Sequence, residues 1–219
     1  MGVGIRAAGP GDRELVVRLL DEAFQDDPVS GWVFPGEEYR RATHHRLMAA
    51  FTDIVLADGR IDVTVDGAAC ALWLPVPAGD QEQEGDEGDD GKEDDGTDEA
   101  VRLREAVDPA NERVEEIARL MAEAHPAGRA HEYLWMIGVT PDRQGDGLGS
   151  ALIEHALRRC DRAGLPAYLE ASSARSTKLY ERLGFAFTGA TLDLPDGGPR
   201  MWPMWREPRS REAAQPRSA

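Results

Sequence analysis

The sequence has few cysteines, no long apolar run and an excess of negative over positive charge. Its 219 residues include only two cysteines, Cys70 and Cys160, which excludes a disulfide framework and favours a reducing, cytoplasmic compartment. No apolar run approaches the roughly 20 residues that cross a bilayer, and the N-terminus lacks the apolar core and cleavage site of an export signal. We therefore expect a cytoplasmic protein without a membrane partner.

The net charge of −16 comes largely from one segment. Residues 79–98 contain eleven Asp or Glu residues and one Lys, so they carry −10 and leave −6 for the rest of the chain. Nucleic-acid binding requires Lys and Arg on one face, so we expect no such partner, and a cationic amine is the better electrostatic match. The segment has no aliphatic or aromatic residue to offset the entropy of ordering, which predicts a disordered acidic insertion.

Apolar periodicity divides the chain into the helices and strands of one domain. We expect this domain over residues 1–208, with a flexible tail at 209–219. Helical spacing predicts helices at 15–24, 37–56, 99–124 with a break near Pro109, 148–164 and 173–183. Strand-like runs lie at 3–7, 60–65, 68–74, 131–139, 166–171, 185–194 and 200–206.

Glycine and proline mark the turns between these elements. Asp66-Gly67 is a dipeptide that favours a two-residue hairpin turn between the strands on either side of it. Pro75 and Pro77 are expected to end the second of these strands. Residues 29–35 have no clear period, so we interpret them as an irregular aromatic segment.

A glycine-rich turn between a strand and a helix is the most informative feature. The run from Val139 to Ser150 contains Gly145, Gly147 and Gly149, which can adopt positive φ and leave space beside the backbone. Backbone N–H groups can then converge on an anion at the helix start, where the dipole adds positive charge. Such a turn suits phosphate, and Arg143 could reach a phosphate oxygen. An ordinary connection is the alternative, and the spacing fits neither the dinucleotide fingerprint nor the P-loop.

This turn resembles the acetyl-CoA loop of the GNAT superfamily of N-acetyltransferases, whose pattern is Gln/Arg-x-x-Gly-x-Gly/Ala. Gln144, Gly147 and Gly149 stand at its fixed positions. Downstream, Leu179-Tyr180 and Gly184-Phe185 match the late segment of the family, Leu-Tyr-x-x-x-Gly-Phe. Two motifs in the right order are far more specific than either alone.

The resemblance implies both a fold and an acetyl donor. The fold is α+β and GNAT-like, with a central, mostly antiparallel mixed sheet of about seven strands, splayed at the strands ending at Val139 and Ala171 and flanked by helices. The donor is acetyl-CoA, with its pantetheine arm along the strand that ends at Val139 and its pyrophosphate on the glycine turn. Ser173 stands where the family often has an Asn near pantetheine. The implied cofactor contacts are Ile137, Gly138, Val139, Arg143, Gln144, Gly145, Asp146, Gly147, Leu148, Gly149, Ser150 and Ser173.

A closer resemblance is to the puromycin N-acetyltransferase-like group of actinobacteria. It covers residues 131–187 and includes Gly164-Leu165-Pro166-Ala167-Tyr168-Leu169-Glu170 and Tyr180-Glu181-Arg182. The N-terminal half, where acceptor specificity is set, matches only loosely. Puromycin therefore does not follow as the substrate.

Acetyl transfer to an amine needs a base and an acid. An alkyl amine with a pKa near ~10.4 is mostly protonated at neutral pH, so a base should help. His131 and Glu132 are our candidates, and a packed or surface His131 is the alternative. Tyr180 matches the family tyrosine that acts as general acid, and a phenol pKa near ~10 keeps it protonated at neutral pH. A core tyrosine is the alternative there.

The acceptor substrate is expected to meet aromatic side chains. In GNAT-like folds the region around 29–35 closes over the acceptor, so Trp32 and Phe34 are candidate contacts, together with Tyr133 at the strand. Filling of the core is the alternative for Trp32 and Phe34. His44 and His45 lack Asp, Glu or Cys at metal-ligand spacing, so we expect surface or partly packed histidines and no metal.

The leading hypothesis is an acetyl-CoA-dependent N-acetyltransferase that transfers acetyl to a primary amine of a small molecule. The amine would attack directly in a ternary complex, with Tyr180 as general acid. One alternative is acetylation of a protein lysine or N-terminus. Another is a regulatory module that binds acyl-CoA without turnover. The sequence leaves open whether the chain forms a homodimer.

Overall fold

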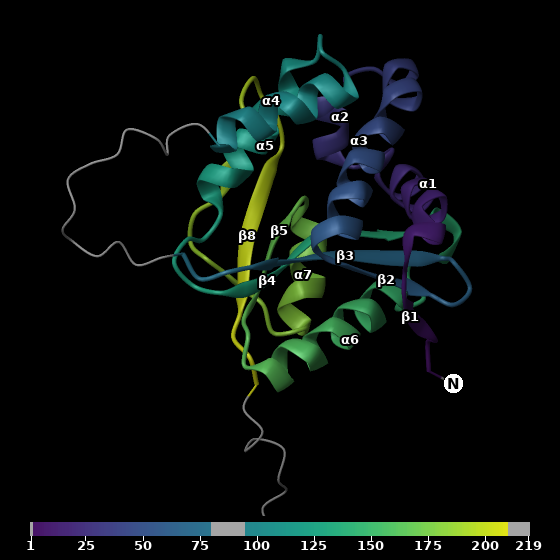
Figure 1. Cartoon of the computed structure of the whole chain (residues 1–219), viewed down its shortest axis with the longest axis vertical. Helices are drawn as coiled ribbons and strands as arrows, with labels where there is room; N and C mark the ends of the chain where they lie inside the picture. Colours follow the sequence, from purple (N-terminus) through teal and green to yellow (C-terminus); the bar gives the residue numbers. More distant parts are fainter. Residues whose placement is uncertain (1, 80–94, 210–219) are drawn as a thin grey trace, which may run out of the picture.

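Eight strands of the described residues form one mixed sheet (Figure 1). The computed structural model describes residues 2–79 and 95–209. The strand order is β1-β2-β3-β4-β5-β8-β6, with β7 also paired to β8, and only β4 and β5 are parallel. The strands are β1 (Ile5–Ala7), β2 (Arg60–Thr64), β3 (Ala69–Val76), β4 (His131–Val139), β5 (Ala167–Ala171), β6 (Ala186–Phe187), β7 (Leu192–Asp193) and β8 (Arg200–Arg206).

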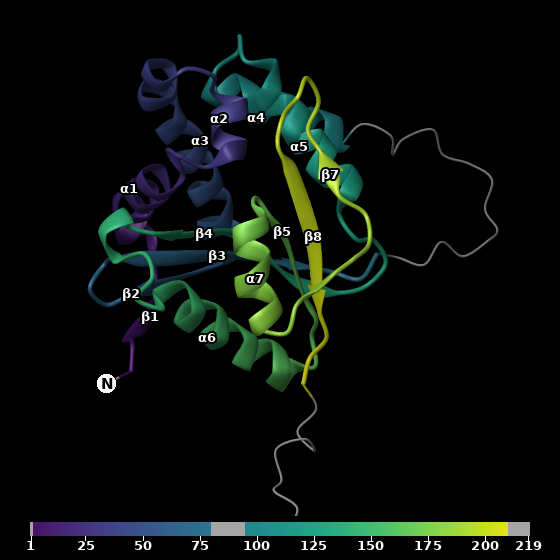
Figure 2. The same ribbon diagram turned by 180° about the vertical axis from the view of Figure 1, so that it is seen from behind.

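Helices cover both faces of this sheet, as Figures 1 and 2 show. Helices α1 and α3 pack on one face and α6 on the other, while α4 and α5 pack against each other and α4 against α3. The helices are α1 (Arg13–Phe24), α2 (Pro28–Val33), α3 (Glu37–Asp58), α4 (Asp95–Val107), α5 (Glu112–Ala124), α6 (Leu148–Ala163) and α7 (Ala174–Arg182). This arrangement is the predicted α+β, GNAT-like architecture.

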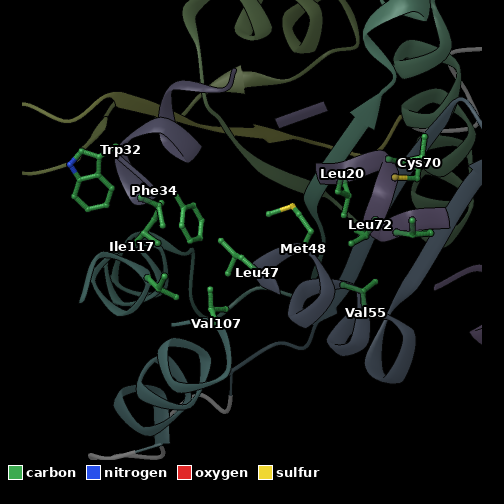
Figure 3. Packing of buried hydrophobic residues seen from close by; sticks show 14 of the residues in the cluster. Leu20, Trp32, Phe34, Leu47, Met48, Val55, Cys70, Leu72, Val107 and Ile117 are labelled. Atoms are coloured by element: carbon green, nitrogen blue, oxygen red, sulfur yellow. The ribbon is translucent and has the colours of Figure 1, made fainter. Parts of the chain in front are cut away.

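Strand alternation gives the sheet two separate cores. On β3, Cys70 and Leu72 belong to the cluster under α1 and α3, part of which Figure 3 shows. Ala71 and Trp73, which alternate with Cys70 and Leu72 along the strand, belong to the cluster under α6. Because successive side chains of a strand point to opposite faces, a strand buried on both sides is apolar throughout.

The sheet opens between its two parallel strands. β4 and β5 pair only at Glu132 with Ala167 and at Tyr133 with Tyr168. β3, in contrast, pairs with β4 from Val76 to Ala69, over the whole length of β4. The edge of β4 that faces β5 is therefore not paired with β5 beyond Tyr133, which confirms the predicted splay.

The predicted hairpin at Asp66-Gly67 is confirmed. Gly67 has φ 69°, and Thr64 Oγ1 accepts hydrogen bonds from the backbone N–H groups of Ala68 and Ala69 at 3.1 and 3.0 Å. The prediction that Pro75 ends the strand is wrong, because β3 continues to Val76. Beyond its pairing with Arg60 of β2, β3 has only β4 beside it, and proline is tolerated at such an edge.

Two other segments differ from the prediction. Residues 28–33 form the helix α2 instead of irregular chain, because the Asp27 carboxylate accepts from the N–H of Val29 at 2.9 Å and Pro28 stands in the first turn. Helix α4 begins at Asp95, inside the segment predicted to be disordered. Residues 80–94 of that segment, like residues 210–219 of the predicted tail, lie outside the described residues.

The last hairpin is interrupted but lies where the sequence placed it. β6 and β7 are two short strands that both pair with β8, with Gly189 at φ 103° between them. Over residues 2–79 and 95–209, none of the helices is long and apolar enough to traverse a lipid bilayer.

Candidate active site

One large cavity extends from the splay of the sheet to helices α3, α4 and α5. Its volume is about 1140 Å³, more than the roughly 300–1000 Å³ of common ligand pockets. Its wall includes residues of β4 and β5, the glycine turn, α7 and one face each of α3, α4 and α5. The cavity is thus large enough to hold two substrates at once.

The glycine turn forms one end of this cavity. Gly145 and Gly147 have φ 94° and 81°, and Gly147 precedes the first residue of α6 without a side-chain cap. The first N–H groups of α6 therefore have no capping oxygen, as an anion site requires. Of the predicted cofactor contacts, those that line the cavity are Ile137, Val139, Arg143, Gln144, Gly145, Gly147, Leu148, Gly149, Ser150 and Ser173.

Gly138 and Asp146 are predicted cofactor contacts that do not line the cavity. A Cβ at Gly138 would lie 3.2 Å from the Ala23 Cβ, so this glycine allows α1 to approach β4. Asp146 accepts from the Arg143 guanidinium at 2.8 Å, and Asp66 accepts from it at 3.2 Å. Arg143 is therefore already paired at the mouth of the cavity.

Tyr180, the predicted general acid, lies in the cavity wall and is 7% exposed. Burial raises the pKa of the phenol above its usual value, and the nearby Asp27 carboxylate raises it further. Ser173 caps the helix that carries Tyr180, because its Oγ accepts from the N–H of Ser176 at 3.2 Å. The phenol is therefore held protonated at neutral pH.

Glu170 is the strongest candidate base, and the prediction missed it. Its side chain is only 2% exposed, and Oε2 accepts from the Tyr133 hydroxyl at 2.7 Å. Oε1 has no hydrogen-bond partner among the described residues. Burial raises the pKa of this carboxyl to about 7, against the lowering effect of Tyr133 and Tyr168. An acidic residue inside an otherwise apolar strand was the sequence signal.

His131 is buried behind the cavity instead of lining it. His125, from the loop after α5, lies in the wall in its place. His131 Nδ1 donates to the Arg129 carbonyl oxygen at 2.7 Å, so His131 Nε2 accepts from His125 Nε2 at 3.0 Å. Nδ1 of His125 is then unprotonated and lies 4.0 Å from Glu170 Oε1. Burial lowers the pKa of His125 to about 4, so both rings are neutral at pH 7.

Glu132 does not face the cavity, because it points to the other side of the sheet from Tyr133. Burial raises its pKa, and the charges that act on it are those of Arg159, Arg60 and Asp62 beside α6. Tyr133, in contrast, lines the cavity as predicted. Glu132, a predicted base, therefore lies outside the cavity, and Glu170 lies in its wall.

Trp32 and Phe34 belong to the core, not to the cavity wall (Figure 3). Trp32 Nε1 donates to the Pro195 carbonyl oxygen at 3.0 Å, and the Arg113 guanidinium lies 5.0 Å from the centre of its ring. Phe34 is fully buried and packs edge-on against His44. The prediction that these two rings contact the acceptor is therefore not supported by their position.

Two further polar groups reach the cavity from α2. Asp27 caps this helix and accepts from the Ser172 hydroxyl at 2.6 Å, and burial raises its pKa. Ser30 donates to His44 Nε2 at 3.0 Å, while His44 Nδ1 donates to Asp21 at 2.7 Å. His44 is thus fully buried, whereas we expected it at or near the surface.

Known proteins are similar in sequence to part of this chain. The sequence model of the Acetyltransferase (GNAT) family matches residues 106–185. An uncharacterised N-acetyltransferase of Schizosaccharomyces pombe is 42% identical over 55 residues, which are 25% of this chain and 22% of that protein. The mycothiol acetyltransferase of Streptomyces avermitilis is 43% identical over 56 residues, 24% of this chain and 18% of that protein. These matches span only about a fifth of the relatives' length.

The fold of the whole chain has a closer counterpart. A crystal structure described as histone acetyltransferase HPA2 and related acetyltransferase, from Corynebacterium glutamicum, superposes with a TM-score of 0.69 and 27% identity, covering 100% of both chains. The fold of the described residues is therefore GNAT-like, and residues 106–185 are similar in sequence to the Acetyltransferase (GNAT) family.

Proposed function

We propose that the protein is an acetyl-CoA-dependent N-acetyltransferase that transfers acetyl to a primary amine of a small molecule. The observation that carries this proposal is the cavity, which brings the glycine turn, Tyr180 and Glu170 together. The turn suits a pyrophosphate, and the two side chains have the proton chemistry of an acid and a base. The similarity of residues 106–185 to the GNAT family supports the same donor.

The residues at the splay fit the acetyl donor. The edge of β4 beyond Tyr133 is free of β5 and can pair with the amides of a pantetheine arm. The uncapped start of α6 can receive the pyrophosphate, and Arg175 and Lys178 on α7 line the same end of the cavity. A backbone N–H of β4 can stabilise the oxyanion. The thioester itself supplies an activated acetyl carbon.

Proton transfer falls to two side chains in our proposal. Glu170 accepts the proton of the amine at Oε1, the oxygen without a partner. The nitrogen forms a bond to the acetyl carbon, the carbon–sulfur bond breaks, and Tyr180 donates its proton to the sulfur. Asp27 is another carboxylate of the cavity wall, but backbone N–H groups and Ser172 already occupy it. This occupation makes Glu170 the better base.

The acceptor is the least constrained part of the proposal. The resemblance to the puromycin N-acetyltransferase-like group covers residues 131–187, which surround the donor. Glu170 lies deep in the wall, with 2% of its side chain exposed, so the amine must enter the cavity to reach it. A free small molecule meets this condition more readily than a folded protein surface does.

Two glutamates on the paired strands β4 and β5 provide a matched test. We expect Glu170→Gln to lower kcat/KM in a thiol-release assay by about 100-fold or more, because it removes the base without changing the side-chain volume. Glu132→Gln, on the opposite face of the sheet, should keep kcat/KM within about twofold. Equal activity of both variants would contradict the role of Glu170.

Acetyl-CoA binding without thiol release for any amine would instead favour the regulatory module, and broad acetylation of a proteome would favour a protein acetyltransferase.

A further inference from the structure

The end of the cavity away from the glycine turn is apolar. Helices α3, α4 and α5 and strand β4 form its wall. The large apolar side chains of this wall are Leu47, Phe51, Leu103, Ile117, Met121 and Trp135. The rings of Phe51 and Trp135 pack together with their centres 4.3 Å apart. Phe51, Leu103, Met121 and Trp135 are only partly buried, so a ligand can cover them, whereas Leu47 and Ile117 are buried. Covering apolar surface stabilises a complex by roughly 25 cal/mol per Å².

The polar groups between this wall and the glycine turn are mainly acceptors. Glu170 offers Oε1, and Asp27 offers the remaining lone pair of a carboxylate that already accepts from two backbone N–H groups and Ser172. Ser30 is an acceptor as well. His44 Nδ1 donates to Asp21, so His44 Nε2 accepts the hydrogen bond of the Ser30 hydroxyl, and the lone pairs of the Ser30 oxygen remain for a ligand. A primary amine or ammonium is the group that these three acceptors suit.

The other charged side chains of the wall come from three elements. Arg143 comes from the glycine turn, and Arg175, Lys178 and Arg182 come from α7. Glu99 and Arg102 come from α4, where both are exposed to solvent. No acidic side chain of the described wall lies among the apolar groups of α3 and α5. A second ammonium group placed there would lose its hydration without a partner.

We propose that the acceptor is a primary amine attached to an apolar, aromatic or branched body, and that Phe51 and Trp135 contact this body. The inference rests on the proposed function and narrows its substrate class. It disfavours diamines and polyamines, because a second ammonium group beside the apolar groups of α3 and α5 would have no acidic partner there, and Glu99 of α4 is exposed to solvent. It also disfavours free amino acids, whose carboxylate would lie beside Glu170 and Asp27.

A panel of primary amines tests this substrate class at fixed acetyl-CoA. We expect kcat/KM for 2-phenylethylamine to exceed that for ethylamine and for 1,4-diaminobutane by at least about 10-fold, because the phenyl ring covers apolar wall. The complementary variant is Leu103→Asp on α4, which places a carboxylate in the wall. It should raise kcat/KM for 1,4-diaminobutane relative to 2-phenylethylamine by about 10-fold.

Two phenylalanines provide the control for the wall. Phe51→Ala should lower kcat/KM for 2-phenylethylamine by about 10-fold and leave that for ethylamine and the KM for acetyl-CoA unchanged. Phe187→Ala removes a ring that is 44% exposed on β6, outside the cavity, and should change none of these values. Two results would overturn the inference and leave the proposed function intact. One is a lower kcat/KM for both amines in Phe51→Ala, and the other is a higher kcat/KM of the unchanged protein for ethylamine or 1,4-diaminobutane than for 2-phenylethylamine. Failure of every amine would reject the proposed function itself.

Discussion

The donor region and the acceptor region of the cavity are built in different ways. The donor region, comprising β4, the glycine turn, α6 and α7, presents mainly backbone N–H groups, which a run of glycines and a helix start expose locally. The proposed acceptor region, comprising α1 to α5 and Trp135 of β4, presents side chains from segments as far apart as Asp27 and Met121. A site made of backbone is encoded by adjacent residues, whereas a site made of side chains depends on how the helices pack.

The two regions also differ in charge. Arg175 and Lys178 of α7 line the cavity and suit an anionic cofactor, whereas Arg143 of the glycine turn is already paired with Asp66 and Asp146. Glu170, Asp27 and the oriented hydroxyl of Ser30 lie nearer the acceptor end, which suits a cation. The same cavity can therefore order two ligands of opposite charge. The predictions below separate the contributions of these regions.

The largest effect is expected from Tyr180, the proposed general acid. Tyr180→Phe should lower kcat by about 100-fold and leave the KM for acetyl-CoA nearly unchanged, because it removes a proton donor but keeps the ring. Tyr39→Phe is the control: the Tyr39 hydroxyl donates to Asp108 at 2.6 Å, so its loss should lower the Tm and not kcat. Steady-state kinetics and thermal melts distinguish the two. Unchanged kcat in Tyr180→Phe would remove Tyr180 from the mechanism.

A smaller effect is expected when the donor region alone is altered. Gly147 and Gly164 stand at the two ends of α6 with φ 81° and 68°, and at both positions a Cβ would meet nothing within 4 Å. Substitution of either by Ala should therefore cost a similar free energy of unfolding, about 1 kcal/mol, from backbone strain. Only Gly147→Ala should weaken acetyl-CoA binding, by about 10-fold in calorimetry. Equal binding by both variants would show that the turn is an ordinary connection.

The same contrast explains what the sequence could predict. The strand, turn and helix around Gly147 were predictable because apolar periodicity and glycine spacing act over a few residues. Tyr180 was predictable because it occupies a fixed place in a local motif. The splay between β4 and β5 was implied only by the resemblance, since two parallel strands meet through a long connection whose register no local signal sets.

The errors fall where contacts span long distances in the chain. Trp32 was expected at the acceptor, but its indole donates to Pro195, 163 positions away, and no pattern near residue 32 indicates that contact. Glu132 and Glu170 are both acidic residues within apolar strands, and only the packing of α6 against one face separates their roles. Pattern alone could have flagged Glu170, because an acidic residue in an apolar strand needs a partner or a function.

The smallest effect concerns the boundary between the two regions, where Tyr133 of β4 contacts Glu170 of β5. A base acts when deprotonated, and burial raises the pKa of Glu170 to about 7, so kcat/KM should fall as the pH drops through that value. The hydroxyl of Tyr133 stabilises the carboxylate, and Tyr133→Phe should therefore raise this apparent pKa by about one unit. A pH profile of kcat/KM measures the shift, and Glu132→Gln should leave the profile in place. An unshifted acidic limb in Tyr133→Phe would mean that another group, of which Asp27 is the nearest candidate in the wall, titrates instead. The base would then belong to α2 and the acceptor region, not to the splayed strands.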